Sequence, residues 1–167
     1  MNPSTTPTPP PVPGKSTPAA IGLATLTNLR LQRTHPAAWL WVSLFVIAFD
    51  QATKFLVNRF LELYDRVEVL PVLDFTLLHN TGAAFSMLAN ASGWQRTFFI
   101  TLGLVVSSAL VVWMWRLPRG EKMLPLALSL IVGGALGNVI DRVAHGYVID
   151  FIHVHWGASY FPAFNIA

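Results

Sequence analysis

Cysteine is absent from this sequence of 167 residues, and charged residues are scarce. Without cysteine the chain forms neither disulfide bonds nor thiolate metal sites. Charged side chains make up 11% of the residues and hydrophobic ones 53%, whereas ordinary soluble domains carry roughly 25% charged residues. The composition therefore predicts an integral membrane protein. Because the net charge of +3 is small and its charges are scattered, we expect no nucleic-acid partner.

Common catalytic and cofactor motifs are also missing. The sequence has no Gly-x-Ser-x-Gly nucleophile motif and no helical His-Glu-x-x-His zinc motif. Gly14-Lys15-Ser16 imitates the end of a phosphate-binding loop, but Pro9 stands where that loop needs a glycine. We therefore expect no cofactor.

Proline, threonine and serine dominate the first part of the chain. Such a segment buries too little apolar surface to offset the entropy lost on ordering it. We therefore predict a disordered tail over residues 1–34. Its proline run also allows a second interpretation, as a polyproline ligand for an aromatic groove.

Three apolar runs follow, over residues 37–57, 97–115 and 123–140. A membrane-spanning helix needs roughly 20 such residues, and the first run reaches that length only if Asp50 lies near one end. The third run contains Gly133 and Gly137, a spacing that permits close helix packing. We predict three transmembrane helices.

The distribution of lysine and arginine along the sequence predicts the orientation of the chain in the membrane. The tail and the loop between the second and third runs hold more cations than the opposite side, where acids dilute them. The positive-inside rule then places the N-terminus in the cytoplasm.

Residues 58–96 and 141–167 are predicted to form a β-rich extracytoplasmic region, because valines alternate around Pro71 and residues 75–80 read as a strand.

Polar residues gather at the predicted outer membrane boundary. Asp50 and Lys54 are spaced to pair along a helix, either as a terminal ion pair at the water boundary or as part of a polar site. Asp141 and Arg142 end the third run beside Asn138. They either mark the membrane boundary as a charge pair or form part of a polar functional site. The turn from Asn80 through Gly82 is either an ordinary β-turn or a backbone path near a ligand.

Asp150 is the strongest catalytic candidate. Strand alternation places it on the same face as Val148, Ile152 and Val154. A carboxylate on an apolar face holds its proton more tightly, which suits a general acid or base. The alternative is an edge aspartate that faces water through a bulge. His153 and His155 share the other face, and with Asp141 or Asp150 they offer a less favoured metal site.

Five segments, FDQATKF, LLHNTGAAFSML, GGALGNVIDRV, VIDFIHVHW and YFPAFNIA, resemble in order those of bacterial lipoprotein signal peptidase, also called signal peptidase II. The resemblance runs from about Trp39 to Ala167. It implies a membrane aspartic peptidase domain over residues 35–167, a monomer of the bacterial inner membrane that contacts lipid. The family has four transmembrane helices, a β-cradle and a short amphipathic helix over its site. Its substrates are prolipoproteins that carry a diacylglyceryl group.

The resemblance also implies which residues form the site. Asp150 matches the first catalytic aspartate. The supporting positions match Asp50, Lys54, Asn80, Gly82, Asn138, Asp141, Arg142 and Asn165.

The family's second catalytic aspartate follows directly after the position of Ala167, and the fourth helix follows that aspartate. We therefore expect a chain that stops at Ala167 to be inactive, and measurable release of signal peptide by that chain would contradict this. The alternative function is a non-catalytic membrane remnant or a protein that binds lipid-modified peptides.

Overall fold

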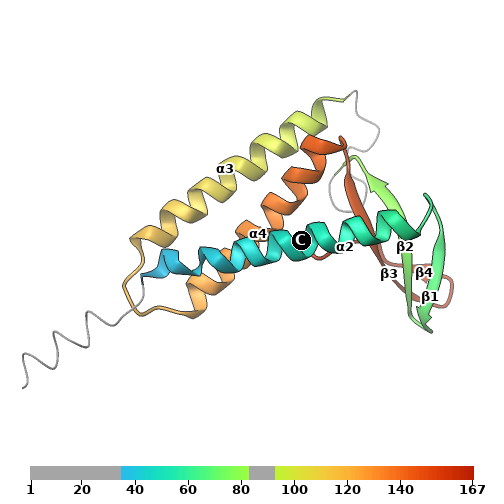
Figure 1. Cartoon of the computed structure of the whole chain (residues 1–167), viewed down its shortest axis with the longest axis horizontal. Helices are drawn as coiled ribbons and strands as arrows, with labels where there is room; N and C mark the ends of the chain where they lie inside the picture. Colours follow the sequence, from blue (N-terminus) through green and yellow to red (C-terminus); the bar gives the residue numbers. More distant parts are fainter. Residues whose placement is uncertain (1–34, 83–92) are drawn as a thin grey trace, which may run out of the picture. The chain divides into compact units, whose positions relative to one another are not determined.

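The computed structural model of the chain describes residues 35–82 and 93–167 (Figure 1). The predicted tail over residues 1–34 lies outside the described residues, so its disorder stays a prediction. All described residues belong to the unit Thr34–Ala167. This unit consists of long helices and one small sheet, and the sheet stands at one end of the helices (Figure 1).

Three long helices follow the three apolar runs. A 3₁₀ turn, η1 (Pro36–Trp39), leads into α2 (Leu40–Phe60), and α3 (Trp94–Arg116) and α4 (Met123–Ala144) come later in the chain. Over the described ranges, three helices are long and apolar enough to cross a membrane. The prediction of three spanning helices is confirmed at this level.

The helices extend beyond the predicted runs. α2 continues to Phe60, α3 begins at Trp94, and α4 continues to Ala144. The helices therefore continue a few residues into the β-rich region predicted for residues 58–96 and 141–167, and Asp50 lies in the middle of α2. The reason is physical: a charged side chain lowers local hydropathy, but it does not interrupt the backbone hydrogen bonds that continue the helix.

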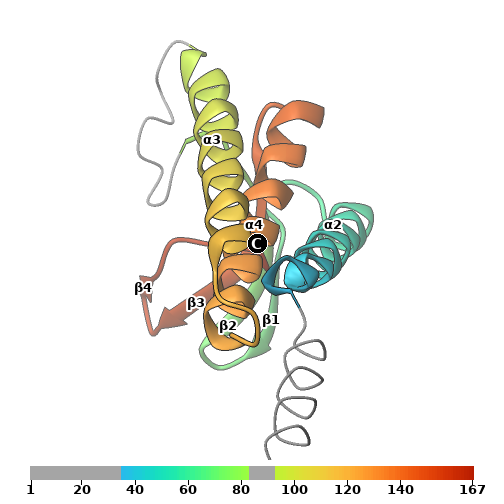
Figure 2. The same ribbon diagram turned by 90° about the vertical axis from the view of Figure 1, so that its left-hand side faces the viewer.

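α4 packs against both α2 and α3 (Figures 1 and 2). The contact with α2 is close because glycines face it. A Cβ atom added at Gly133 would lie 2.8 Å from the Cβ of Val46, and one added at Gly137 would lie 2.6 Å from Oδ2 of Asp50. The close packing predicted from the glycine spacing is confirmed, and it lets α4 approach the polar side chains of α2.

Four antiparallel strands form the sheet in the order β1-β2-β3-β4. They are β1 (Arg66–Leu70), β2 (Leu73–Asn80), β3 (Val148–Trp156) and β4 (Ser159–Tyr160). The first hairpin turns at Pro71, as predicted, because proline cannot donate a ladder hydrogen bond.

Pairing of β2 with β3 joins distant parts of the chain. Leu78 lies opposite Asp150, and Asn80 lies opposite Val148. The register shifts between Phe75 and Leu78, where β2 carries an extra residue. This pairing brings the Asn80 turn next to Asp150.

The observed architecture agrees with the predicted class, a mainly helical membrane protein with a small sheet. Two features implied by the resemblance are not found in residues 35–82 and 93–167: a fourth spanning helix and a short amphipathic helix.

Candidate active site

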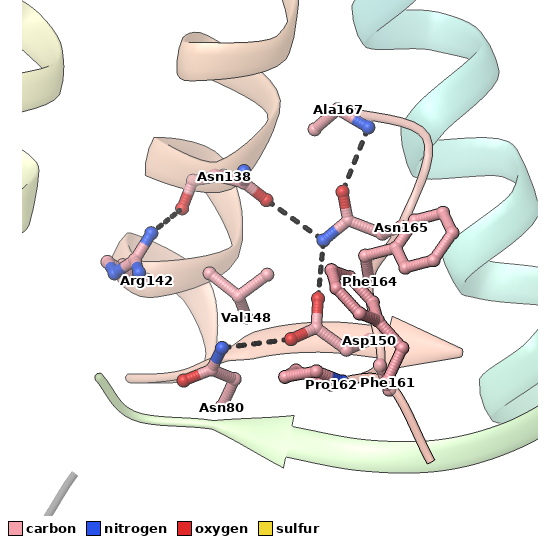
Figure 3. A pocket seen from close by; sticks show the side chains of 11 residues that line it. Asn80, Asn138, Arg142, Val148, Asp150, Phe161, Pro162, Phe164, Asn165 and Ala167 are labelled. Atoms are coloured by element: carbon pink, nitrogen blue, oxygen red, sulfur yellow. Dashed lines mark hydrogen bonds between the residues drawn. The ribbon is translucent and has the colours of Figure 1, made fainter. Parts of the chain in front are cut away.

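Asp150 lies near the start of β3 and points into a cavity of about 300 Å³ (Figure 3). Its residue is only 6% exposed. Val148 on the same face is also buried, but Val154 is 38% exposed, so the predicted apolar face is buried only where β3 begins. Burial of Asp150 contradicts the alternative in which it faces water.

Two side-chain amides hold the carboxylate of Asp150. Asn80 donates from Nδ2 to Oδ2 over 2.9 Å, and Asn165 donates from Nδ2 to Oδ1 over 2.7 Å (Figure 3). The oxygen of each amide is also engaged: Asn80 Oδ1 accepts from Gly82 N, and Asn165 Oδ1 accepts from Ala167 N. These backbone contacts fix each amide with its NH₂ group toward Asp150.

Burial raises the pKa of the Asp150 carboxyl above its ordinary value of 3.8. Hydrogen bonds from Asn80 and Asn165 and the charges of Lys54 and Arg142 act in the opposite direction. The net upward direction of the pKa means that Asp150 holds a proton more readily than an exposed aspartate. A carboxyl of this kind is suited to give and take a proton during a reaction.

The raised pKa of Asp150 predicts a pH dependence of stability. Because folding favours the protonated carboxyl, this contribution is fully present below pH 3.8, the ordinary value, and is lost as the pH rises through the folded-state pKa. The free energy of unfolding of the unchanged protein should therefore fall, relative to that of Asp150→Asn, as the pH rises. Denaturation in detergent between about pH 3 and 7 measures this difference, and the opposite slope would contradict a raised pKa.

A second cluster joins α2 to α4 behind the cavity. Nζ of Lys54 lies 2.8 Å from Oδ2 of Asp50 and 2.8 Å from Oδ2 of Asp141. The predicted pairing of Asp50 with Lys54 is confirmed, and Asp141 is added to it. Residue exposures of 0%, 1% and 1% for Asp50, Lys54 and Asp141 contradict the alternative of a solvated pair at the water boundary.

Gln51 belongs to the same cluster and was not predicted. Its Nε2 donates to Asp141 Oδ1 over 2.8 Å, to Asp50 Oδ2 over 3.2 Å and to the carbonyl oxygen of Gly137 over 3.2 Å. The sequence signal that could have identified Gln51 is its position directly after Asp50 inside an apolar run.

Asn138 connects this cluster to Asp150. Its Oδ1 accepts from Lys54 Nζ over 3.1 Å and from Asn165 Nδ2 over 3.2 Å. Asp141 makes a second connection, because its Oδ2 accepts from the backbone nitrogen of Ile149, the residue before Asp150. The buried charges therefore position the start of β3 as well as the helices.

Arg142 holds the turn that carries Asn80. It donates through one terminal nitrogen to the carbonyl oxygen of Gly82 over 2.8 Å and through the other to that of Asn138 over 3.3 Å. Arg96, which was not predicted, donates in turn to the carbonyl oxygens of Arg142 and Val143. The predicted turn of residues 80–86 is seen only up to Gly82, because residues 83–92 lie outside the described residues.

The predicted site residues occupy two layers. Asn80, Asn138, Arg142, Asp150 and Asn165 line the cavity, together with Ala167 (Figure 3). Lys54 and Gly82 bond to those residues, and Asp50 and Asp141 join the site through Lys54.

His155 faces Asp74, whereas His153 lines a second cavity that Asp150 also lines. Nε2 of His155 lies 3.4 Å from Oδ1 of Asp74, and both imidazoles pack against the ring of Tyr160. In the part of the chain that the structure describes, no group of three His, Asp or Glu residues is arranged to hold a metal ion. The alternative metal site with Asp141 or Asp150 gains no support from this geometry.

Comparison with known proteins identifies the family of this chain. The family described as signal peptidase (SPase) II matches residues 42–167. This chain belongs to the signal peptidase II family. The lipoprotein signal peptidase of Pseudomonas putida is 53% identical over 132 residues, covering 78% of this chain and 77% of the relative. That of Pseudomonas syringae is 51% identical over 146 residues, covering 86% and 83%.

Solved structures agree with membership of the signal peptidase II family. A bacterial membrane enzyme solved by the in meso method superposes with a TM-score of 0.70 at 35% identity, and the match covers 80% of each chain. A second structure with the same description gives a TM-score of 0.69 at 34% identity.

Proposed function

We propose that this signal peptidase II cuts signal peptides from diacylglyceryl-modified prolipoproteins, with Asp150 as one of two catalytic carboxylates. The observation that carries the proposal is the environment of Asp150. It is buried in a cavity beside α4 and accepts hydrogen bonds from two amides whose orientation is fixed. The second carboxylate is the aspartate that the family pattern places directly after Ala167, and Ala167 lines the same cavity.

In the proposed reaction the two carboxyl groups share the work of acid and base. One takes a proton from a water molecule as the water oxygen attacks the scissile carbonyl carbon. The other donates a proton to the amide nitrogen, and the carbon–nitrogen bond then breaks. Asn80 and Asn165 hold Asp150 in position, and Arg142 and Asn138 hold those amides and their turns.

The same proposal includes the setting of the enzyme. The chain acts as a monomer in the bacterial inner membrane, with its N-terminus in the cytoplasm and Asp150 at the extracytoplasmic face. This is supported by the cation-rich loop between α3 and α4 and by the exposed apolar side chains along the helices, which suit contact with lipid. The substrate's signal helix and acyl chains lie against these helices.

Cleavage of a defined precursor tests the proposal. The enzyme is expressed together with the aspartate that follows Ala167 in the family pattern. It should release signal peptide from a lipid-modified precursor in lipid vesicles. The same precursor without its diacylglyceryl group is the matched control and should remain uncut.

A chelator should leave this rate unchanged, because the proposed chemistry uses carboxylates alone. Loss of activity on chelation, restored by added zinc, would instead favour a metal held by His153 and His155. Binding of the lipid-modified precursor without any cleavage would favour a lipopeptide-binding protein.

A further inference from the structure

Arg142 is a buried cation whose guanidinium group is only partly hydrogen-bonded. The residue is 9% exposed, and its two terminal nitrogens donate to the carbonyl oxygens of Gly82 and Asn138. Within residues 35–82 and 93–167, its Nε has no hydrogen-bond partner and its side chain forms no ion pair. A buried charge of this kind needs other compensation from its surroundings.

Phe99 of α3 supplies part of that compensation. The guanidinium carbon of Arg142 lies over the half-buried ring of Phe99, 5.0 Å from the ring centroid. The face of an aromatic ring attracts a cation within about 6 Å, and the attraction is larger where water is excluded. Phe99 therefore contacts the plane of the guanidinium group, while the two carbonyl oxygens bind its terminal nitrogens.

Arg96, one turn before Phe99 on α3, contacts the backbone at Arg142. It donates to the carbonyl oxygen of Arg142 over 2.8 Å and to that of Val143 over 2.9 Å. Both carbonyls belong to the last turn of α4, where the helix dipole favours a cation. In α3 itself Arg96 lies in the first turn, where the dipole disfavours a cation. The position of Arg96 is therefore explained by α4 and not by its own helix.

We propose that Arg96 and Phe99 are positioning residues for catalysis, which act on Asp150 through Arg142. This inference rests on the proposed function. Neither residue lines a cavity at Asp150, so neither is placed to touch the substrate there. α3, which packs beside α4 (Figures 1 and 2), thereby acquires a role beyond crossing the membrane.

Arg142 is connected to Asp150 by hydrogen bonds. It binds the carbonyl oxygen of Gly82, whose backbone nitrogen donates to Asn80 Oδ1. Asn80 Nδ2 in turn donates to Asp150 (Figure 3). A displaced Arg142 therefore leaves the turn at Gly82, and with it the amide that holds Asp150, less well fixed.

The charge of Arg142 gives a second connection. Burial raises the pKa of Asp150, and the positive charges of Lys54 and Arg142 act against that rise. If Arg142 moves away from Asp150, only Lys54 of these two cations remains in place. The pKa of Asp150 should then rise further, and the acid limb of the pH–rate profile should move to higher pH.

Phe99→Leu tests the ring contact in the enzyme that carries the second aspartate of the family. It should lower kcat for the lipid-modified precursor by about tenfold and change KM by less than about twofold. The acid limb should move to higher pH. Phe99→Tyr keeps the ring and should restore both values. Phe55→Leu is the matched control, because Phe55 is a 69% exposed ring on α2 that lines neither cavity at Asp150.

Arg96→Lys tests the backbone contact without changing the net charge. Lysine replaces the planar fork by a single nitrogen, so kcat should fall by about threefold or more and the acid limb should again move to higher pH. This variant keeps the cation near the end of α4, so it decides the inference even if Phe99→Leu fails to fold. Arg59→Lys, at an exposed position of α2, is the matched control and should change neither value.

The outcomes separate the inference from the proposed function. Cleavage by the unchanged enzyme with an unmoved acid limb in Arg96→Lys and in folded Phe99→Leu would overturn the inference, whatever the change in kcat, because a purely structural role lowers the amount of folded enzyme alone. Absence of cleavage by the unchanged enzyme would instead overturn the proposed function.

Discussion

Asp150→Asn should abolish cleavage of the lipid-modified precursor while the protein stays folded. A carboxamide neither takes a proton from water nor gives one to the leaving nitrogen, so one half of the acid–base pair is lost. General acid–base catalysis contributes about 10²–10⁴-fold to a rate, and we expect kcat to fall by at least that factor. The measurement is release of signal peptide at saturating substrate, with the second aspartate of the family present in both proteins.

Asp74→Asn is the matched control for this experiment. Asp74 is also buried in the sheet, at 2% exposure, and lies on the strand next to β3. It faces Arg66 and His155 and lines neither cavity at Asp150. Asp74→Asn should retain kcat within about threefold even if stability falls, because it takes no part in proton transfer. A similar loss in both variants would indicate that folding, and not catalysis, explains the effect of Asp150→Asn.

Asp150→Asn should also lower stability, because the side-chain amides of Asn80 and Asn165 both point their NH₂ groups at position 150. Asn80 and Asn165 both present NH₂ groups to position 150, and backbone nitrogens hold both amides in that orientation. The NH₂ group of a new asparagine would oppose one of these donors. This unpaired contact costs Asp150→Asn about 1–3 kcal/mol at every pH. The raised pKa of Asp150 acts in the opposite direction as the pH rises, because it lowers the stability of the unchanged protein relative to Asp150→Asn.

Apolar runs and strand alternation were sufficient to predict the three long helices, the strands on either side of Pro71 and the burial of Asp150. These signals are local, because each depends on residues a few positions apart. The helix ends were predicted less well, since Asp141 and Arg142 continue α4 through backbone hydrogen bonds that hydropathy does not register. Local patterns therefore predict which elements exist better than where they end.

Contacts across the fold explain what the sequence did not reveal. Gln51 donates to Asp141, 90 positions away, and Arg96 donates to the carbonyl oxygen of Arg142, 46 positions away. Nothing in the spacing of either residue indicates its partner. The positions implied by the family resemblance included Lys54 and Asn138, but how they join depends on the approach of α4 to α2 at Gly137.

Lys54→Met should produce the largest loss of stability of any single change in the helices. Lys54 is the cation between two buried carboxylates, Asp50 and Asp141, and its own residue is 1% exposed. Methionine keeps much of the volume but leaves both carboxylates without their cation. Removal of one partner from a buried ion pair typically costs about 3–5 kcal/mol, and denaturant titration in detergent measures this loss.

Two further variants separate charge from packing. Arg59→Met changes a cation on the exposed surface of the same helix, α2, and should shift the free energy of unfolding by about 0.5 kcal/mol or less. Asp50→Asn combined with Lys54→Met should recover part of the loss, because one uncompensated carboxylate is then removed. The double-mutant cycle gives the coupling energy, and a coupling near zero would show that the pair does not act as a unit.

Lys54→Met should also slow cleavage, although Lys54 does not line the cavity at Asp150. Its loss leaves Asp141 without its cation, and Asp141 Oδ2 holds the backbone nitrogen of Ile149 just before Asp150. Its loss also removes one of the two donors to Asn138 Oδ1, the oxygen that accepts from Asn165. A positioning role of this kind should lower kcat more than it changes KM, because the substrate does not touch Lys54. An increase in KM alone would instead place Lys54 in direct contact with the substrate.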